Sequence, residues 1–228
     1  MEQMNEEQAK AARAEQFRKA KLDKVERFKR LNRYVQPGQI LFVGSSLMEQ
    51  FPIYEFLQDF DLPFKIYNRG IGGYTTMDLL ESMDVCVYDL KPAHVFINIG
   101  TNDMNGPDYN RDELIGRYAK ILEGIREHLP QTTITVLAYY PVNPTAAERD
   151  SLVKKAFEYR TNARIQEANE AVCALAERFG ARYLDLNAAL RDEQGNLKDE
   201  YTIEGIHMYA NGYKPVLDQL IPVLRELS

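Results

Sequence analysis

The chain has few of the residues that build metal centres and disulfide frameworks, with three histidines and two cysteines among 228 residues. Because Cys86 and Cys173 lack metal-ligand spacing and no His, Cys and Asp cluster supplies it, we expect free thiols, a reducing compartment such as the cytoplasm, and no metal. The sequence also lacks the run of about 18 apolar residues that a membrane span needs. Its first 34 residues carry charges throughout, which is unlike a signal peptide.

The chain also has fewer basic than acidic residues. A net charge of -6 and a pI near 5.3 disfavour polyanionic ligands, so we expect no nucleic-acid partner. Hydrophobic residues at 45% and charged residues at 27% are typical of a soluble globular protein. The length suffices for one well-packed domain.

Residues 1–36 are predicted to form an N-terminal amphipathic helix extension, and residues 37–228 the main domain. Strong helix formers predominate from Asn5 to Tyr34, where apolar residues recur at helical intervals: Phe17, Leu22, Val25, Phe28 and Leu31. We expect this stripe to pack on the main domain or on a second subunit, so a homodimer is a further prediction. Interspersed acids and bases disfavour a membrane-binding helix.

The main domain alternates between two kinds of pattern. Runs rich in β-branched and aromatic residues predict strands at Gln39 to Val43, Phe64 to Tyr67, His94 to Ile99, Thr133 to Tyr139 and Ala181 to Leu186. Helical patterns lie at 47–58, 76–89, 109–128, 145–179 and 210–227. This alternation predicts an α/β fold with a parallel sheet covered by helices on both faces. In such sheets, ligands bind beyond the carboxyl ends of the strands.

The motif Glu204-Gly-Ile-His207 holds the one histidine of three that lies in a polar, glycine-containing segment. A histidine whose imidazolium a neighbouring carboxylate stabilises can take a proton from a nucleophile near neutral pH. Ser46 follows the first predicted strand at a strand-to-helix turn, where a hydroxyl is exposed. The pair predicts a serine hydrolase, although a helix cap at Ser45 or Ser46 explains these serines taken alone.

Two further loops follow predicted strands. Asn68-Arg-Gly-Ile-Gly-Gly-Tyr-Thr-Thr76 is rich in glycine but lacks the Gly-x-Gly-x-x-Gly dinucleotide fingerprint, so an organic cofactor is poorly supported. The Gly73 N–H and the Asn102 side-chain amide, within Gly100-Thr-Asn-Asp103, could each donate a hydrogen bond to a developing oxyanion. Taken alone, each loop also has a local explanation as a positive-φ turn with a helix cap at Thr75 or Thr76, or as an Asx-turn at Asn102 or Asp103.

Together, the four motifs occur in order at successive predicted strand ends and before the last predicted helix. In this order and spacing they resemble the SGNH hydrolases, the GDSL-type esterase/lipase family, and Asn68-Arg-Gly-Ile-Gly-Gly73 resembles the platelet-activating-factor acetylhydrolase-like branch. The resemblance covers residues 39 to 227. It implies a flavodoxin-like three-layer α/β/α sandwich with five parallel strands in the order 2-1-3-4-5, an ester substrate, and no metal or organic cofactor.

The resemblance also implies a role for individual residues. Ser46 matches the nucleophile, His207 the general base, and Glu204 stands where the family has an aspartate. The backbone N–H groups of Ser46 and Gly73 and the side chain of Asn102 match the three donors of the oxyanion hole.

Four positions depart from the family pattern. Ser45 replaces the acidic residue before the nucleophile, and Glu204 is one methylene longer than the usual aspartate, so the histidine could instead lean on a backbone carbonyl. Tyr74 and Met208 replace a frequent aspartate and a common proline, from which we expect a more apolar pocket rim.

Short loops between the motifs and the absence of a lid-like apolar insertion predict a preference for short acyl chains, acetyl first. Tyr139-Tyr-Pro-Val142, after the fourth predicted strand, could line the pocket, although an aromatic pair at a strand end is more often packing. Two other functions stay open. One is a non-catalytic ligand-binding member of the same fold, impaired by the changes at Ser45 and Glu204. The other is a flavodoxin-like flavin or nucleotide protein, for which the sequence has no clear phosphate loop.

Overall fold

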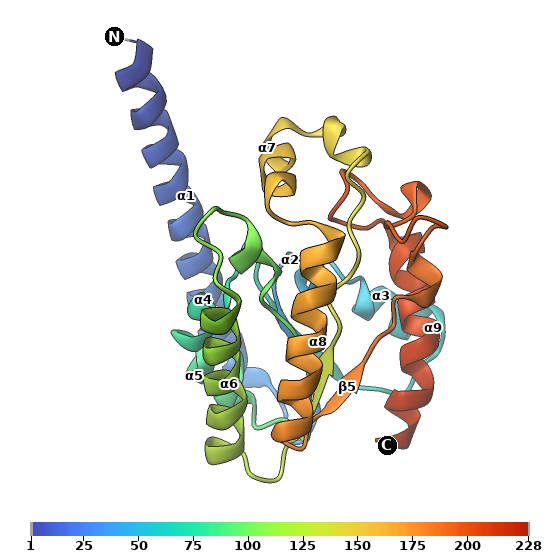
Figure 1. Ribbon diagram of the computed structural model, residues 1–228. Helices are drawn as coiled ribbons and strands as arrows, with labels where there is room; N and C mark the ends of the chain where they lie inside the picture. The colour runs from blue at the N-terminus through green and yellow to red at the C-terminus, as the bar shows by residue number, and fades with distance from the viewer. Residues whose placement is uncertain (1, 228) are drawn as a thin grey trace.

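The computed structural model describes residues 2–227, so the expected extension at 1–36 and main domain at 37–228 each have one end residue outside the described residues. The strands are β1 (Ile40–Gly44), β2 (Ile66–Gly70), β3 (His94–Asn98), β4 (Thr133–Leu137) and β5 (Arg182–Leu184). The α-helices are α1 (Glu2–Leu31), α2 (Ser46–Glu49), α3 (Ile53–Asp59), α4 (Thr76–Leu80), α5 (Met83–Cys86), α6 (Arg111–His128), α7 (Ser151–Lys154), α8 (Asn162–Arg178) and α9 (Ala210–Glu226). Figure 1 shows their arrangement.

The strands form one parallel sheet in the order β2-β1-β3-β4-β5. The α/β class, the five parallel strands and the 2-1-3-4-5 order are therefore confirmed. Because all strands point the same way, the loops that follow β1, β2 and β3 meet at one edge of the sheet, as expected for a ligand site.

Two apolar cores flank the sheet and make the molecule three-layered. One core contains Phe28 of α1, Tyr118 of α6 and Val172 of α8, whereas the other contains Phe56 of α3 and Val216 of α9. Successive residues of β1 belong to alternate cores, because side chains of a strand point alternately to its two faces. Both faces of the central strands are thus buried, which is why their sequences are almost continuously apolar.

Strand β2 begins and ends later than its apolar run predicts. The first three residues of the glycine-rich motif, Asn68-Arg-Gly70, pair in register with β1, and Gly70 lies opposite Gly44. Propensity disfavours asparagine and glycine in strands, but the backbone ladder with β1 overrides it here. As a result, the motif's remaining glycines start directly at the carboxyl edge of the sheet.

The single helix expected over 145–179 is wrong. This segment consists of a 3₁₀ turn (Ala146–Arg149), α7, a second 3₁₀ turn (Lys155–Glu158) and α8. The chain is extended at Thr161, whose side chain accepts the Arg164 N–H and caps α8. A buried side chain, Arg160, precedes this cap, so tertiary contacts end a helical pattern that local propensity would continue.

Helix α1 packs on the domain through only part of its apolar stripe. Phe28 is buried and Val25 packs against the same core, whereas Phe17, Leu22 and Leu31 are each at least half exposed. Figure 1 shows the N-terminal half of α1 extending past the carboxyl edge of the sheet. The helix therefore joins the domain at its C-terminal half, and the rest projects beyond the sheet.

Cys86 of α5 is buried and Cys173 of α8 is half-buried, and both are free thiols, as expected. Across residues 2–227, none of the helices has the length and apolar character to cross a bilayer.

Candidate active site

Ser46 is the first residue of α2, at the tight turn that follows β1. Strand β2 passes directly against this turn, since a Cβ atom on Gly70 would lie 2.2 Å from the Glu49 nitrogen. Only glycine permits such an approach of two backbones. Asn68 Nδ2 also donates to the Met48 carbonyl at 2.7 Å. The glycine-rich motif thus holds the turn that presents Ser46.

His207 lies on a short loop before α9 that is closed by hydrogen bonds to one side chain. Thr202 Oγ1 donates to the His207 carbonyl at 2.9 Å and accepts the Gly205 N–H at 2.8 Å. Gly205 has a φ of 100°, and a Cβ atom there would lie 2.4 Å from the Asn143 carbonyl oxygen. Glycine at this position therefore lets the loop pack against the segment after β4, which fixes the histidine.

Ser46, His207 and Glu204 form a continuous hydrogen-bonded chain. Ser46 Oγ lies 2.9 Å from His207 Nε2, and His207 Nδ1 is hydrogen-bonded to Glu204 Oε1. With Nδ1–H donating to the carboxylate, Nε2 is left to accept the hydroxyl proton. Ser45 occupies the N-cap position of α2 but makes no side-chain cap hydrogen bond, so capping does not account for this pair of serines.

The carboxylate of Glu204 is buried, whereas the imidazole is reachable. The exposed fraction is 7% for the Glu204 side chain and 26% for that of His207. Glu204 Oε1 accepts from both the ring and the backbone N–H of His207, and Oε2 has no hydrogen-bond partner among the described residues. The longer acid thus reaches the imidazole through one oxygen, and a backbone carbonyl does not take its place.

The two expected backbone donors, Ser46 and Gly73, belong to neighbouring loops. Within residues 2–227, no hydrogen bond engages the N–H of Ser46 or that of Gly73. The loops are adjacent, because a Cβ atom on Gly72 would lie 4.0 Å from Ser46 Cβ. Gly73 has a φ of 71°, in the left-handed region that favours glycine.

Helix α1 supports this glycine loop, which the sequence did not predict. Glu49 accepts the Gly72 N–H at 2.6 Å and pairs with Lys24 of α1 at 2.9 Å. Phe17 of α1 lies against Gly73, since a Cβ atom there would lie 2.5 Å from the phenyl ring. A cavity of about 300 Å³ between α1 and the loop is lined by both Phe17 and Gly72.

Asn102 presents its amide at the third strand end. Its Nδ2 donates to the Tyr74 carbonyl at 2.9 Å, which leaves one amide hydrogen unused. Its Oδ1 accepts from Arg160 Nη2 at 2.7 Å and from Asn105 Nδ2 at 3.2 Å. The helix expected over 145–179 included Arg160. The one sequence signal for a helix boundary here is Thr161, a residue type that favours the N-cap position.

Asp103 ties the Asn102 loop to the glycine loop. It accepts the Thr76 N–H at 3.0 Å and the Thr76 hydroxyl at 2.5 Å. Arg117 of α6 donates to both partners, at 2.9 Å to Thr76 and 3.3 Å to Asp103. Of the two expected candidates, Thr75 and Thr76, it is Thr75 that caps α4, in a capping box with Asp78.

The expectation that Tyr74 and Met208 make the pocket rim more apolar is wrong. Tyr74 and Met208 are each 3% exposed and belong to the two cores, so they do not line the site's mouth. Tyr139 and Tyr140 are likewise buried, which agrees with packing. An exposed aromatic residue that does lie against the glycine loop is Phe17, from a part of the chain outside the motif.

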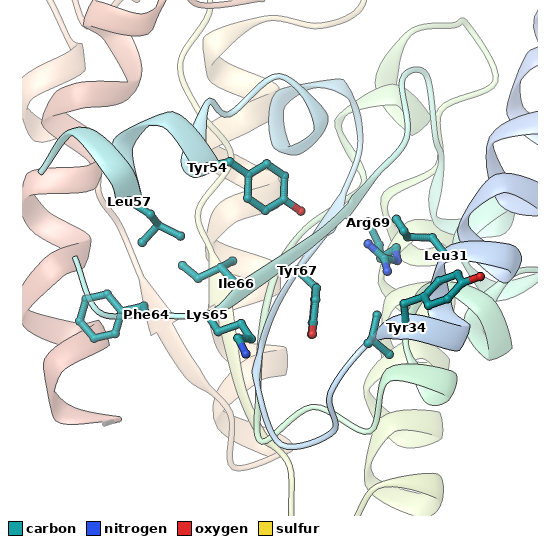
Figure 2. A pocket seen from close by; sticks show the side chains of 10 residues that line it. Leu31, Tyr34, Tyr54, Leu57, Phe64, Lys65, Ile66, Tyr67 and Arg69 are labelled. Carbon is teal, nitrogen blue, oxygen red and sulfur yellow. The ribbon is translucent and has the colours of Figure 1, made fainter. Parts of the chain in front are cut away.

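A separate cavity of about 450 Å³ lies along the edge strand β2, between α3 and the end of α1. Figure 2 shows Tyr54, Tyr67 and Arg69 among its lining side chains. The residue Arg69 is 1% exposed, and its guanidinium donates to Asn32 Oδ1 and to the Asn68 carbonyl. This cavity contains none of the predicted site residues.

Among the described residues, no group of three His, Cys, Asp or Glu side chains has a metal-binding arrangement.

Comparisons of sequence and of structure relate this chain to the same group of known proteins. The model of the GDSL-like Lipase/Acylhydrolase family matches residues 49–214, which begin three positions after Ser46. Platelet-activating factor acetylhydrolase IB subunit alpha1 of Bos taurus is 25% identical over 190 residues, or 83% of this chain and 76% of that protein.

Solved structures share the whole architecture. A Streptococcus pneumonia protein described as a platelet activating factor superposes with a TM-score of 0.84 and 31% identity, covering 95% of this chain and 98% of the other. A GDSL-like lipase from Bacteroides thetaiotaomicron gives a TM-score of 0.69 at 23% identity, covering 88% of this chain and 98% of the other.

Proposed function

The chain belongs to the GDSL-like lipase/acylhydrolase family, whose members hydrolyse carboxylic esters, and we propose that it is a serine esterase that uses Ser46, His207 and Glu204. The observation that carries the proposal is the hydrogen-bonded chain from Ser46 Oγ through both ring nitrogens of His207 to Glu204. A nucleophile next to a base, with the base oriented by a third group, is the arrangement that activates a serine hydroxyl.

In the proposed mechanism, Ser46 Oγ attacks the ester carbonyl carbon while His207 Nε2 takes the hydroxyl proton. Glu204 holds the ring by Nδ1–H and stabilises the imidazolium. The backbone N–H groups of Ser46 and Gly73 and the free amide hydrogen of Asn102 donate to the oxyanion of the tetrahedral intermediate. His207 then protonates the leaving alcohol, and it activates the water that releases the acyl group from Ser46.

For the substrate, we propose a small ester with a short acyl group, acetyl first. The curated relative at 25% identity, which is named an acetylhydrolase, supports this choice. In a series of p-nitrophenyl esters, kcat/KM should fall from acetate to decanoate. Faster cleavage of decanoate would contradict the proposed chain length but not the proposed nucleophile.

Hydrolysis of p-nitrophenyl acetate by purified protein tests the enzymatic role directly. Wild type should turn over, and Ser46→Ala should not. Ser45→Ala is the matched control, since it removes the neighbouring hydroxyl and should leave most activity. If Ser45→Ala lost turnover and Ser46→Ala kept it, the nucleophile would be misassigned.

The homodimer remains a prediction for the exposed part of α1. Light scattering should give twice the chain mass, and Leu22→Glu, at a residue 54% exposed, should reduce it to one chain mass. A single-chain mass for wild type would remove the dimer.

A further inference from the structure

Arg160 is a buried cation beside the candidate site that the mechanism above does not use. It lies between the second 3₁₀ turn and α8, and the residue is 2% exposed. Its Nη2 donates to Asn102 Oδ1 at 2.7 Å, whereas its Nε has no hydrogen-bond partner among the described residues. Burial lowers the pKa of Arg160 to about 10, while the charges of Glu204 and Asp103 act in the opposite direction. The guanidinium therefore stays charged at neutral pH.

A side-chain amide serves an oxyanion only in one of its two orientations. If the amide of Asn102 rotated by half a turn, its oxygen would face both the oxyanion and the Tyr74 carbonyl, which are acceptors. Its NH₂ would then face the guanidinium of Arg160, which has only donors. The present hydrogen bonds to Tyr74 and Arg160 thus select the orientation that leaves a free N–H.

Of the two groups that donate to Asn102 Oδ1, Arg160 is the more effective. Asn105 is exposed and neutral, its contact is longer at 3.2 Å, and its own amide can rotate. The Arg160 hydrogen bond is charge-assisted and buried, which makes it stronger than a neutral one and shields it from water. A cation on the far side of the amide also polarises the N–H that points to the reaction.

We propose that Arg160 is a positioning residue of the esterase, which holds the Asn102 amide with its N–H toward the oxyanion and strengthens it as a donor. Arg160 acts through Asn102 and touches neither substrate nor the reacting atoms. The oxyanion forms after substrate binding, so the interaction stabilises the transition state more than the bound ester. The inference rests on the proposed esterase function.

A double-mutant cycle tests the proposal with four full-length proteins: wild type, Arg160→Met, Asn102→Ala and the double variant. Each is assayed with p-nitrophenyl acetate for kcat and KM. Since one oxyanion donor is worth about 10² to 10³ in kcat, Arg160→Met should lower kcat by about 10-fold to 100-fold and leave KM within about 3-fold. In the Asn102→Ala background, the same substitution should change kcat by less than about 3-fold, because its partner is absent.

Three results would overturn the proposal: an equal loss of kcat in both backgrounds, a loss in KM instead of kcat, or no loss in wild type. If wild type hydrolysed no ester and Ser46 reacted with no fluorophosphonate, the proposed function itself would fail. An active wild type with an additive cycle would remove only the role of Arg160.

Two further variants keep the test decisive. Arg126→Met is the matched control, because this arginine of α6 donates to backbone carbonyls near the start of β5, and it should leave kcat unchanged. Arg160→Lys keeps the charge and should recover part of the lost kcat. Should thermal unfolding show that Arg160→Met does not fold, Arg160→Lys enters the same cycle with the same criteria, at a smaller expected loss.

Discussion

The histidine half of the candidate site, Ser46, His207 and Glu204, is joined by direct hydrogen bonds, and two of its three members come from one loop. The oxyanion half, Gly73 and Asn102, is assembled differently. Each of these residues lies on its own loop and depends on a distant segment, α1 for Gly73 and Arg160 for Asn102. One half is therefore held together by direct hydrogen bonds among its members, and the other by contacts with residues outside it.

This difference predicts how each half responds to change. In the histidine half, the reacting groups touch one another, so removal of one should stop the chemistry. In the oxyanion half, several N–H groups donate to one oxyanion, and more than one residue holds each donor in place. Removal of a single residue should therefore lower kcat only in part, and distant residues should also affect kcat.

Ser46→Ala should have the largest effect. Loss of the nucleophile should lower kcat for p-nitrophenyl acetate by about 10⁴-fold or more, since only binding and the oxyanion donors remain. Steady-state kinetics checks this, with Ser45→Ala as the control. If Ser46→Ala lowered kcat by less than Asn102→Ala does, the expected order of the two halves would be wrong.

Glu204→Ala should lower kcat by about 10³-fold to 10⁴-fold, because the imidazole loses the group that fixes its tautomer and stabilises its charge. Glu204→Asp sharpens the prediction. It shortens the acid by one methylene but keeps a carboxylate that can accept from the imidazole, so it should retain far more activity than alanine. Equal kcat for Glu204→Ala and wild type would show that the acid does not orient the base.

Asn102→Ala should lower kcat by about 10²-fold to 10³-fold, as for one oxyanion donor, with little change in KM. The matched control is Asn105→Ala, which removes the weaker donor to Asn102 Oδ1 and should have a much smaller effect. If the control lost as much as Asn102→Ala, Asn105 and not Arg160 would hold the amide.

The smallest effect is expected at α1. Phe17→Ala removes the ring that lies against Gly73, and by loosening one oxyanion donor it should lower kcat by about 3-fold to 10-fold. Leu22→Ala, also on the exposed part of α1, should leave kcat unchanged, and the same kinetic assay compares them. Equal effects of the two would mean that α1 does not support the glycine loop.

The sequence was a good guide where the signal is local. Alternating strand and helix patterns predict the parallel sheet, and the three-residue spacing from Glu204 to His207 predicts an acid next to a base. Capping propensity also predicts a cap at Thr75 or Thr76, and Thr75 caps α4. These features depend on neighbours within a few positions, which sequence patterns record.

The sequence was a poor guide where partners lie far apart in the chain. Helix formers predominate in 145–179, and Thr161 as an N-cap is the one local signal for the break, whereas the contact of buried Arg160 with Asn102 joins residues 58 positions apart. The contact of Phe17 with Gly73 joins residues that no local pattern connects. Strand β2 ends later than its sequence predicts for the same reason, because its last residues pair with β1.

Fluorophosphonate labelling followed by peptide mass spectrometry shows whether His207 activates the hydroxyl of Ser46. We expect one adduct on Ser46 in wild type, and almost none in His207→Ala or after unfolding. Labelling of Ser45, or no labelling of folded wild type, would contradict this expectation.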